Sequence, residues 1–248
     1  MQRDTTQDQA SGLRQLFAPP VGPRVHALSC PAQEAFVLPI AHVLCHAMVE
    51  RAIHVAWIDE FDLAMRQEWP LPCPVRFDLS QSLMNHVPLA SSLQSLNPHL
   101  WYALSRRLAR VPVNVFPTLL QRLQGSGLVL DQVLLCLSTH LQRSLSHYHD
   151  SIHHTVLTAC SAQDLAQTRD WIFKVQAHQR AASWSVVLVG GDTDQRAYEQ
   201  LAQSVEPLLG QPIQLLGQVA AEFPQGQLAS AWQAPLALRD MILAHLFA

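Results

Sequence analysis

Residues 25–36 read VHALSCPAQEAF, residues 37–51 read VLPIAHVLCHAMVER, and residues 52–60 read AIHVAWIDE. The first stretch opens with a short apolar run that is typical of a buried strand. The second places its apolar residues at the three-to-four-residue spacing of a helix, and the third is another apolar run that ends in acids. This order predicts a strand, a tight turn, a helix and a second strand.

The turn before the helix differs from the turns that bind nucleotides. In nucleotide-binding α/β proteins this turn is rich in glycine, because backbone N–H groups must surround a phosphate at the N-terminus of the helix. Here residues 30–34 read CPAQE, with no glycine and with a carboxylate that would repel phosphate. A Walker-type loop also needs a lysine in the turn. The single lysine of the chain, Lys174, lies far from it in the sequence.

Composition restricts the class of protein. The chain has 248 residues, of which 49% are hydrophobic and 14% charged, so it can bury a substantial core. A net charge of −3 and scattered arginines argue against a nucleic-acid partner, which usually requires a basic face. The five cysteines lack the spacing of a zinc site, which favours reduced thiols in the cytosol. The polar N-terminus and the absence of a span-length apolar run lead us to expect a cytoplasmic protein.

Apolar runs recur along the chain and alternate with helix-like segments. The segments 164–178 and 198–209 have helical spacing, and LWYALSRRLARV, residues 100–111, predicts a further helix. The alternation predicts an α/β fold with a mainly parallel sheet and helices on both faces. The predicted strands cover residues 25–30, 53–58, 111–116, 129–137, 154–159, 184–190 and 213–217.

Residues 1–20 form a separate segment, because prolines 19, 20 and 23 end any helix before the first strand. Thr6 and Gln9 have the spacing of a capping box, which predicts a short helix. Its apolar face holds Ala10, Leu13 and Phe17. So short a helix is marginal alone in water, so it could fold onto a partner. The alternatives are a frayed tail and a helix docked on its own domain, residues 21–248.

The segment DQASGLR, residues 8–14, resembles the DQAxxLR signature of the FlhG/FleN-type flagellar number regulators, which belong to the MinD/ParA group of P-loop ATPases. In that family the motif engages an FlhF-type, signal-recognition GTPase and stimulates its GTP hydrolysis. The resemblance implies a partner-binding segment with polar contacts from Gln9 and Arg14. Its residues are Asp8, Gln9, Ala10, Leu13, Arg14 and Phe17.

The rest of the chain is similar to the MinD order of elements. Residues 25–44 occupy the place of the first strand, the KGGxGKT loop and its helix, with the lysine and glycines replaced. In the family the strand that follows this helix ends in an aspartate-rich switch motif. Residues 52–62 resemble that strand, and Asp59 corresponds to the first acid of the motif. In LDQVLLCLS, residues 130–138, Asp131 is kept at the strand's start and Cys136 stands where a metal-linked aspartate would be. VVLVGGDTD, residues 186–194, lacks the base-recognising asparagine, and QLASAWQAPL, residues 227–236, is similar to a late helix.

The resemblance therefore implies a MinD-like domain with a degenerate nucleotide site. Without the lysine, the metal acid and the asparagine, little remains to neutralise a triphosphate, so we expect no ATP hydrolysis and no cofactor. The alternative is an ATPase that retains switching with ATP and magnesium through unusual contacts, and a third interpretation is an unrelated α/β enzyme. The site residues are Ser29, Cys30, Pro31, Ala32, Gln33, Glu34, Asp59, Asp131 and Cys136.

The resemblance also implies partners and a location. We expect the FlhF-type GTPase as partner, with basal-body or transcriptional regulator proteins as further candidates, and a cytoplasmic protein that can lie at the inner membrane or the cell pole. The C-terminal residues 236–248 form an amphipathic pattern with one arginine and no lysine, which favours packing on the domain over membrane binding.

Two histidine groups suggest metal sites but are better explained by packing. On a helix, His149 and His153 would share a face beside Asp150, yet the segment 147–154 is expected to pass from a loop into a strand. The i, i+3, i+4 spacing of residues 42, 45 and 46 falls on an otherwise apolar helix. We therefore predict no metal site.

Overall fold

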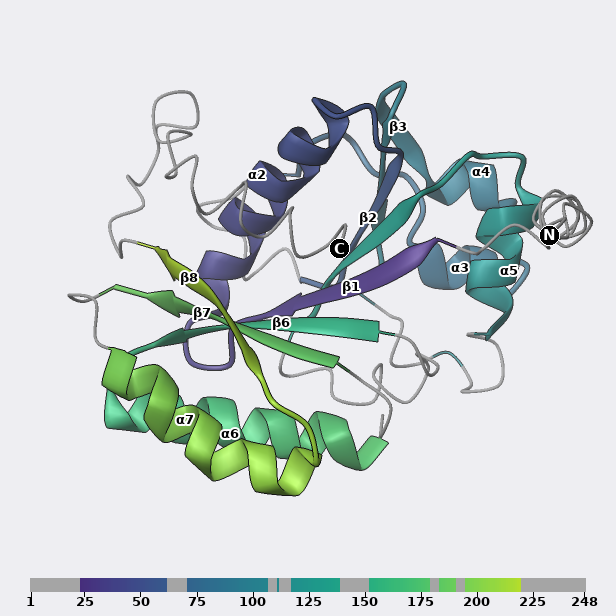
Figure 1. Ribbon diagram of the computed structural model, residues 1–248. Coiled ribbons are helices and arrows are strands. Elements are labelled where there is room, and N and C mark those ends of the chain that lie inside the picture. Colours follow the sequence, from purple (N-terminus) through teal and green to yellow (C-terminus); the bar gives the residue numbers. More distant parts are fainter. Residues whose placement is uncertain are drawn as a thin grey trace, which may run out of the picture.

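The computed structural model describes residues 23–61, 71–106, 111, 117–138, 152–178, 183–190 and 195–219 (Figure 1). Within these ranges one eight-stranded sheet has the order β3-β4-β2-β5-β1-β6-β7-β8. All neighbouring strands are parallel except β3, which is antiparallel to β4. The strands are β1 Arg24–Ser29, β2 Val55–Asp59, β3 Gln94–Asn97, β4 Leu100–Leu104, β5 Gln132–Cys136, β6 Ile152–Ala159, β7 Ser183–Val189 and β8 Gln214–Val219.

Helices cover both faces of the sheet, as the alternation of elements predicts. The helix α2 packs against one face, and α6 and α7 lie side by side on the other (Figure 1). The apolar side chains of α3 and α5 belong to the same core cluster as those of α6 and α7. The helices are η1 Glu34–Phe36, α2 Val37–Val49, α3 Leu79–Leu83, α4 Leu89–Ser92, α5 Pro117–Gly125, α6 Ala162–His178 and α7 Gln195–Leu209.

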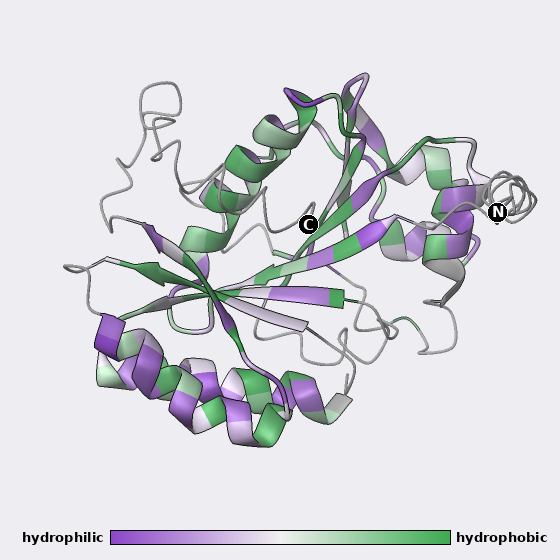
Figure 2. Cartoon of the chain, viewed as in Figure 1, coloured by the Kyte–Doolittle hydropathy of each residue, from purple (hydrophilic) through white to green (hydrophobic). Residues whose placement is uncertain are grey.

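The helix α7 shows why these segments fold as they do. Its buried residues, Ala197, Leu201, Ala202, Val205 and Leu209, recur at helical spacing and face the sheet. Hydrophilic and hydrophobic residues accordingly alternate around α6 and α7 (Figure 2). Among the helices in the described ranges, none has the length and apolar character needed to cross a membrane.

The helix predicted over residues 100–111 is wrong where it can be checked, because Leu100–Leu104 is strand β4. Tyr102 is fully buried, and Leu100 and Leu104 are nearly so. Aromatic residues such as Trp101 and Tyr102 favour strands, and a short apolar run that is buried on both faces cannot be told from a helix by its spacing. The short polar strand β3 was not predicted. The predicted strand 111–116 lies outside the described residues, apart from Val111.

Candidate functional site

The carboxyl ends of the parallel strands meet at one edge of the sheet, and the candidate site lies there. Leu28 of β1 and Asp59 of β2 are both paired in register with Cys136 of β5. The loop that leaves β1 runs from Cys30 to Gln33 and enters η1 at Glu34. The structure therefore brings together the predicted residues 29–34, Asp59 and Cys136.

The loop after β1 has no left-handed backbone. Gln33, which precedes η1, has φ −145° and ψ 76°, and no residue between 30 and 36 has a positive φ. Loops that enclose phosphate form a nest of successive N–H groups, which alternates right-handed and left-handed residues. The carboxylate of Glu34 accepts hydrogen bonds from Ser138 Oγ, at 3.2 Å to Oε1 and 3.4 Å to Oε2. An acid is thus held where a phosphate-binding loop presents donors.

Cys30 is a buried, neutral thiol. Burial raises its pKa to about 12, and the charges of Asp164 and Glu34 act in the same direction. Hydrogen bonds from the backbone of Gln33 and Ala32 lower the pKa but do not offset the burial. Since the thiolate is the reactive form, this residue does not have the setting of a catalytic nucleophile.

Both carboxylate oxygens of Asp59 accept hydrogen bonds from groups of the same chain. The aspartate is fully buried. Its Oδ1 accepts from the backbone N–H of Phe61 at 2.9 Å, and its Oδ2 accepts from the hydroxyl of Tyr102 at 2.9 Å. The Asp59 carbonyl accepts from the backbone N–H of Ser105 at 2.7 Å. The carboxylate is therefore bound into the sheet, and Tyr102 is a site residue that the wrong helix prediction for residues 100–111 concealed.

Cys136 is also fully buried and acts as a hydrogen-bond acceptor for an indole. Trp57 Nε1 lies 3.1 Å from Cys136 Sγ and donates to it. Trp57 was not predicted as a site residue, although it shares a sheet face with Cys136. On the other face Trp171 of α6 donates from Nε1 to Ser29 Oγ at 3.0 Å, so Ser29 also has a partner from the chain itself.

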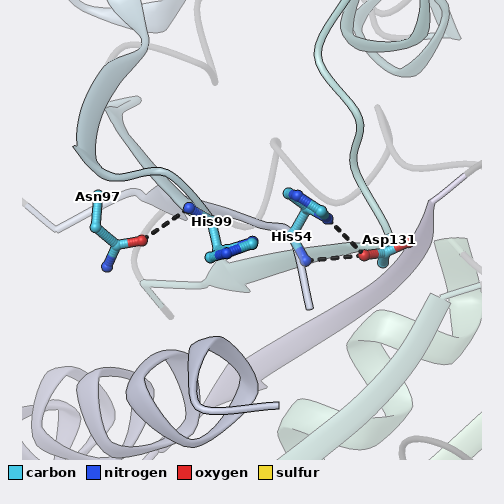
Figure 3. Close-up of polar contacts among 4 residues, drawn as sticks. All are labelled: His54, Asn97, His99 and Asp131. Atoms are coloured by element: carbon cyan, nitrogen blue, oxygen red, sulfur yellow. Dashed lines mark hydrogen bonds and ion pairs between the residues drawn. The ribbon is translucent and has the colours of Figure 1, made fainter. Parts of the chain in front are cut away.

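Asp131 lies at the opposite edge of the sheet, so the structure does not group it with the loop. It precedes β5, and a strand of this length spans about 16 Å from one edge to the other. Its Oδ2 accepts from the backbone N–H of His54 at 2.8 Å and lies 3.1 Å from His54 Nδ1 (Figure 3). The His54 ring lies 4.6 Å from the ring of His99, whose backbone N–H donates to Asn97 Oδ1.

The histidine groups have structural partners. His153 and His154 lie in β6, where successive side chains point to opposite faces. His153 bonds with Ser183 and Ser185, and His154 stacks on Trp184. In the part of the chain that the structure describes, no group of three or more His, Cys, Asp or Glu residues is placed to hold a metal ion. Residues 147, 149 and 150 lie outside that part.

The residues at this edge do not fit a triphosphate with magnesium. The loop offers no glycine nest and no lysine, and it carries Glu34. Asp59 already accepts from two protein donors, and a thiol stands at position 136. The predicted partner-binding residues 8–17 and the late segment 227–248 lie outside the described residues.

No protein-family model matches the sequence, and no curated protein does. Solved structures do match the fold. The MinC:MinD cell division protein complex of Aquifex aeolicus matches with a TM-score of 0.62 at 12% identity, over 91% of this chain and 96% of that one. A Cyanothece McdA variant in complex with ATP matches with a TM-score of 0.63 at 12% identity, over 91% and 96%. A plasmid partition protein of Borrelia burgdorferi gives 0.61 at 10% identity, over 91% and 100%.

These likenesses confirm the predicted fold. The chain has a mainly parallel sheet with flanking helices of the kind found in MinD/ParA-type P-loop ATPases. At 10 to 12% identity they concern the fold alone.

Proposed function

We propose that this protein is a MinD/ParA-like regulator of flagellar number that acts through protein contacts, its N-terminal segment stimulating an FlhF-type GTPase. The observation that carries this proposal is DQASGLR at residues 8–14, ahead of a domain with the MinD-like fold. The structurally similar MinD of Aquifex aeolicus is in a complex with a protein partner, MinC. Action through a protein partner therefore suits this fold.

We further propose that the domain does not hydrolyse ATP. The support is the chemistry at the carboxyl edge, where Glu34 occupies the loop and the carboxylate of Asp59 is bound by Tyr102. Phosphoryl transfer depends on positive groups and a metal that neutralise the charge of the phosphates. The described part of this edge contributes acids and neutral donors in their place.

The GTPase assay tests the activating role. GTP hydrolysis by the cognate FlhF-type GTPase is measured alone, with this protein and with its 1–20 peptide. We expect stimulation by both, reduced by Gln9→Ala. The matched control is Gln7→Ala, which removes the same side chain outside the motif and should stimulate as the unchanged protein does. Lack of stimulation by protein and peptide alike would refute the activating role.

Calorimetry tests the absence of an ATP cycle. ATP with magnesium is titrated into the full chain and into Glu34→Gln, which removes the repulsive charge and keeps the shape of the side chain. We expect no binding in the micromolar range for either. A micromolar dissociation constant for the unchanged protein would overturn this part of the proposal and leave the GTPase result standing.

The second candidate function is a nucleotide-switched ATPase with the same regulatory role. It is favoured by the bound nucleotides of structurally similar proteins, namely ATP in the McdA complex and ADP with magnesium in a cobyrinic acid a,c-diamide synthase from Mycobacterium smegmatis. A change in the oligomeric state of this protein on adding ATP and magnesium would select it. The cytoplasmic or polar location and the basal-body or transcriptional partners remain parts of the proposal.

A further inference from the structure

A shallow hollow lies between the turn that joins α3 to α4 and the helix α5, and we call it the α5 hollow. Its volume is about 500 Å³, which is within the usual range of ligand-binding pockets. One side is apolar and comes from Val87, Pro88 and Leu89. The other side is polar and includes Gln121, Arg122 and Ser126.

The apolar side is held in place by the way α3 ends. Asn85 follows the helix with φ 62°, a left-handed conformation that asparagine tolerates. The N–H of His86 donates to Gln81 O at 2.8 Å and that of Asn85 to Ser82 O at 3.0 Å, which closes the helix end. The Ser82 hydroxyl then reaches Pro88 O at 3.1 Å. These bonds fix the turn, so the hollow is formed in advance of any occupant.

Arg122 places a positive charge at the polar side. Its Nη1 donates to Ser82 O and its Nη2 to Asn85 Oδ1, each at 2.7 Å. Both acceptors are neutral, and among the described residues no carboxylate forms an ion pair with Arg122. A guanidinium has five N–H donors, so further donors remain for a carboxylate. The hollow thus suits a segment with one acid and several apolar side chains.

Two exposed apolar side chains lie close in the sequence to residues that line the α5 hollow. Met84 precedes Asn85 and is 38% exposed, and Val129 follows Ser126 by three residues and is 64% exposed. Across the described ranges, the remaining large apolar side chain that is exposed is Leu208, on α7. Exposed apolar side chains on the segments that supply the lining residues favour a surface that another segment covers.

We propose that the N-terminal segment of the same chain, residues 1–20, docks in the α5 hollow. Asp8 supplies the acid for Arg122, and the apolar face of Ala10, Leu13 and Phe17 covers the apolar side. The segment thus has both features that the hollow requires.

The tether favours this occupant over the acidic segment that follows β8. The N–H of Arg24 donates to Asp131 O at 3.0 Å, and Asp131 lies five residues after Ser126 of the hollow. With Phe17 docked, the six residues from 18 to 23 form the tether, and they can span roughly 20 Å when extended, which lets the segment fold back onto α5. The segment after β8 begins at the opposite side of the sheet, away from α3, α4 and α5 (Figure 1).

Docking would reduce the access of the GTPase to the N-terminal segment, a consequence that rests on the function proposed above. A short tether gives an effective concentration of about 1 mM, so even a weak intrinsic dissociation constant of about 0.1 mM keeps the segment docked about 90% of the time. The GTPase would then meet a free segment about one tenth of the time. Its apparent affinity for the full protein would be about tenfold lower than for the 1–20 peptide.

Hydrogen exchange tests the docking without reference to the GTPase. Exchange of residues 1–20 is followed by mass spectrometry in the full chain and in the synthetic 1–20 peptide. We expect exchange about tenfold slower in the full chain, independent of protein concentration, and restored to the rate of the peptide by Leu13→Ser. Equal rates in the chain and the peptide would overturn the proposal. Protection that grows with concentration would also overturn it, because it would mean docking between copies.

A matched pair of variants on α5 locates the docking site. Gln121 lines the hollow and Gln124 does not, although both are exposed on the same helix. Gln121→Glu places a negative charge beside the docked acid and should reduce the protection about threefold, whereas Gln124→Glu should leave it unchanged. Equal effects of the two variants would place the segment elsewhere and refute this site. The free 1–20 peptide has no domain to dock on, so its stimulation of the GTPase does not depend on docking. Failure of the proposed function would appear in that peptide assay, and failure of the docking in the exchange measurements.

Discussion

The stacked histidines of α2 should make this protein sensitive to mild acid. His42 lies edge-on to Trp57, with ring centroids 5.9 Å apart, and stacks on His46 at 4.5 Å. Burial lowers the pKa of His42 from 6.5 to about 4, and the neighbouring charge of His46 acts in the same direction. Protonation would therefore place a charge against the packed face between α2 and β2.

The sign and size of the effect follow from this pKa. Because the folded state holds the His42 proton less tightly than the unfolded chain, the free energy of unfolding falls as the pH is lowered from about 6.5 to about 4. One pKa unit corresponds to about 1.4 kcal/mol, so a shift from 6.5 to about 4 gives an upper bound of about 3.5 kcal/mol. Since His42 is only partly buried and water screens its charge, we expect a loss of about 1.5 kcal/mol between pH 7.5 and 4.5.

Urea unfolding at pH 7.5, 5.5 and 4.5 measures this loss. The glutamine of His42→Gln cannot ionise. Between pH 7.5 and 4.5, the free energy of unfolding of this variant should therefore fall by about 1.5 kcal/mol less than that of the unchanged protein. His86→Gln is the matched control, because His86 is exposed on the α3–α4 turn. If His42→Gln and His86→Gln had the same acid dependence as the unchanged protein, the reasoning would be refuted.

Three further predictions concern single contacts. Tyr102→Phe leaves the buried carboxylate of Asp59 without its hydroxyl donor and should lower the free energy of unfolding by about 2 kcal/mol, about twice the loss for Tyr198→Phe, whose hydroxyl serves a backbone carbonyl. Asn85→Ala should cost about 1 kcal/mol in the same unfolding assay, and Asn85→Gly less, because φ is 62° there. At pH 8, alkylation of native Cys30 should be about a thousandfold slower than that of an ordinary thiol, as judged by mass spectrometry, because its pKa is about 12.

The parallel fold could be predicted because most of the parallel strands are compact apolar runs that alternate with segments of helical spacing. Residues 25–30 and 184–190 became β1 and β7 for this reason. The prediction failed where the same sequence pattern is compatible with a strand and with a helix. Residues 100–104 lie between β2 and β3 in the sheet and pack on both of its faces, so the run is apolar throughout. A short run that is apolar throughout does not distinguish a strand from a helix. The strand β3, QSLN, is a short polar edge strand with no apolar signal.

The site could be predicted in part, because parallel strands place their carboxyl ends together. The family resemblance grouped residues 29–34 with Asp59 and Cys136, and the parallel strands bring these residues to one edge of the sheet. Asp131 was predicted at the start of its strand, and the same rule puts that position at the opposite edge of the sheet, away from the loop. The partners of the site residues could not be predicted. Tyr102 is 43 residues from Asp59, and Trp57 is 79 residues from Cys136, so these contacts depend on the order of the strands and not on local spacing.

The candidate site differs from a nucleotide site by more than the missing lysine. Glu34 is bonded to Ser138, the carboxylate of Asp59 to Tyr102, and the thiol of Cys136 to Trp57, so each position has a neutral donor from a different element. Buried polar groups need such partners, and a carboxylate freed for a metal would first have to give up its bonds within the sheet. The same contacts tie β2, β4 and β5 together at their carboxyl ends. This edge therefore forms part of a rigid scaffold, and in the function proposed above the contact with the partner is made by residues 8–17.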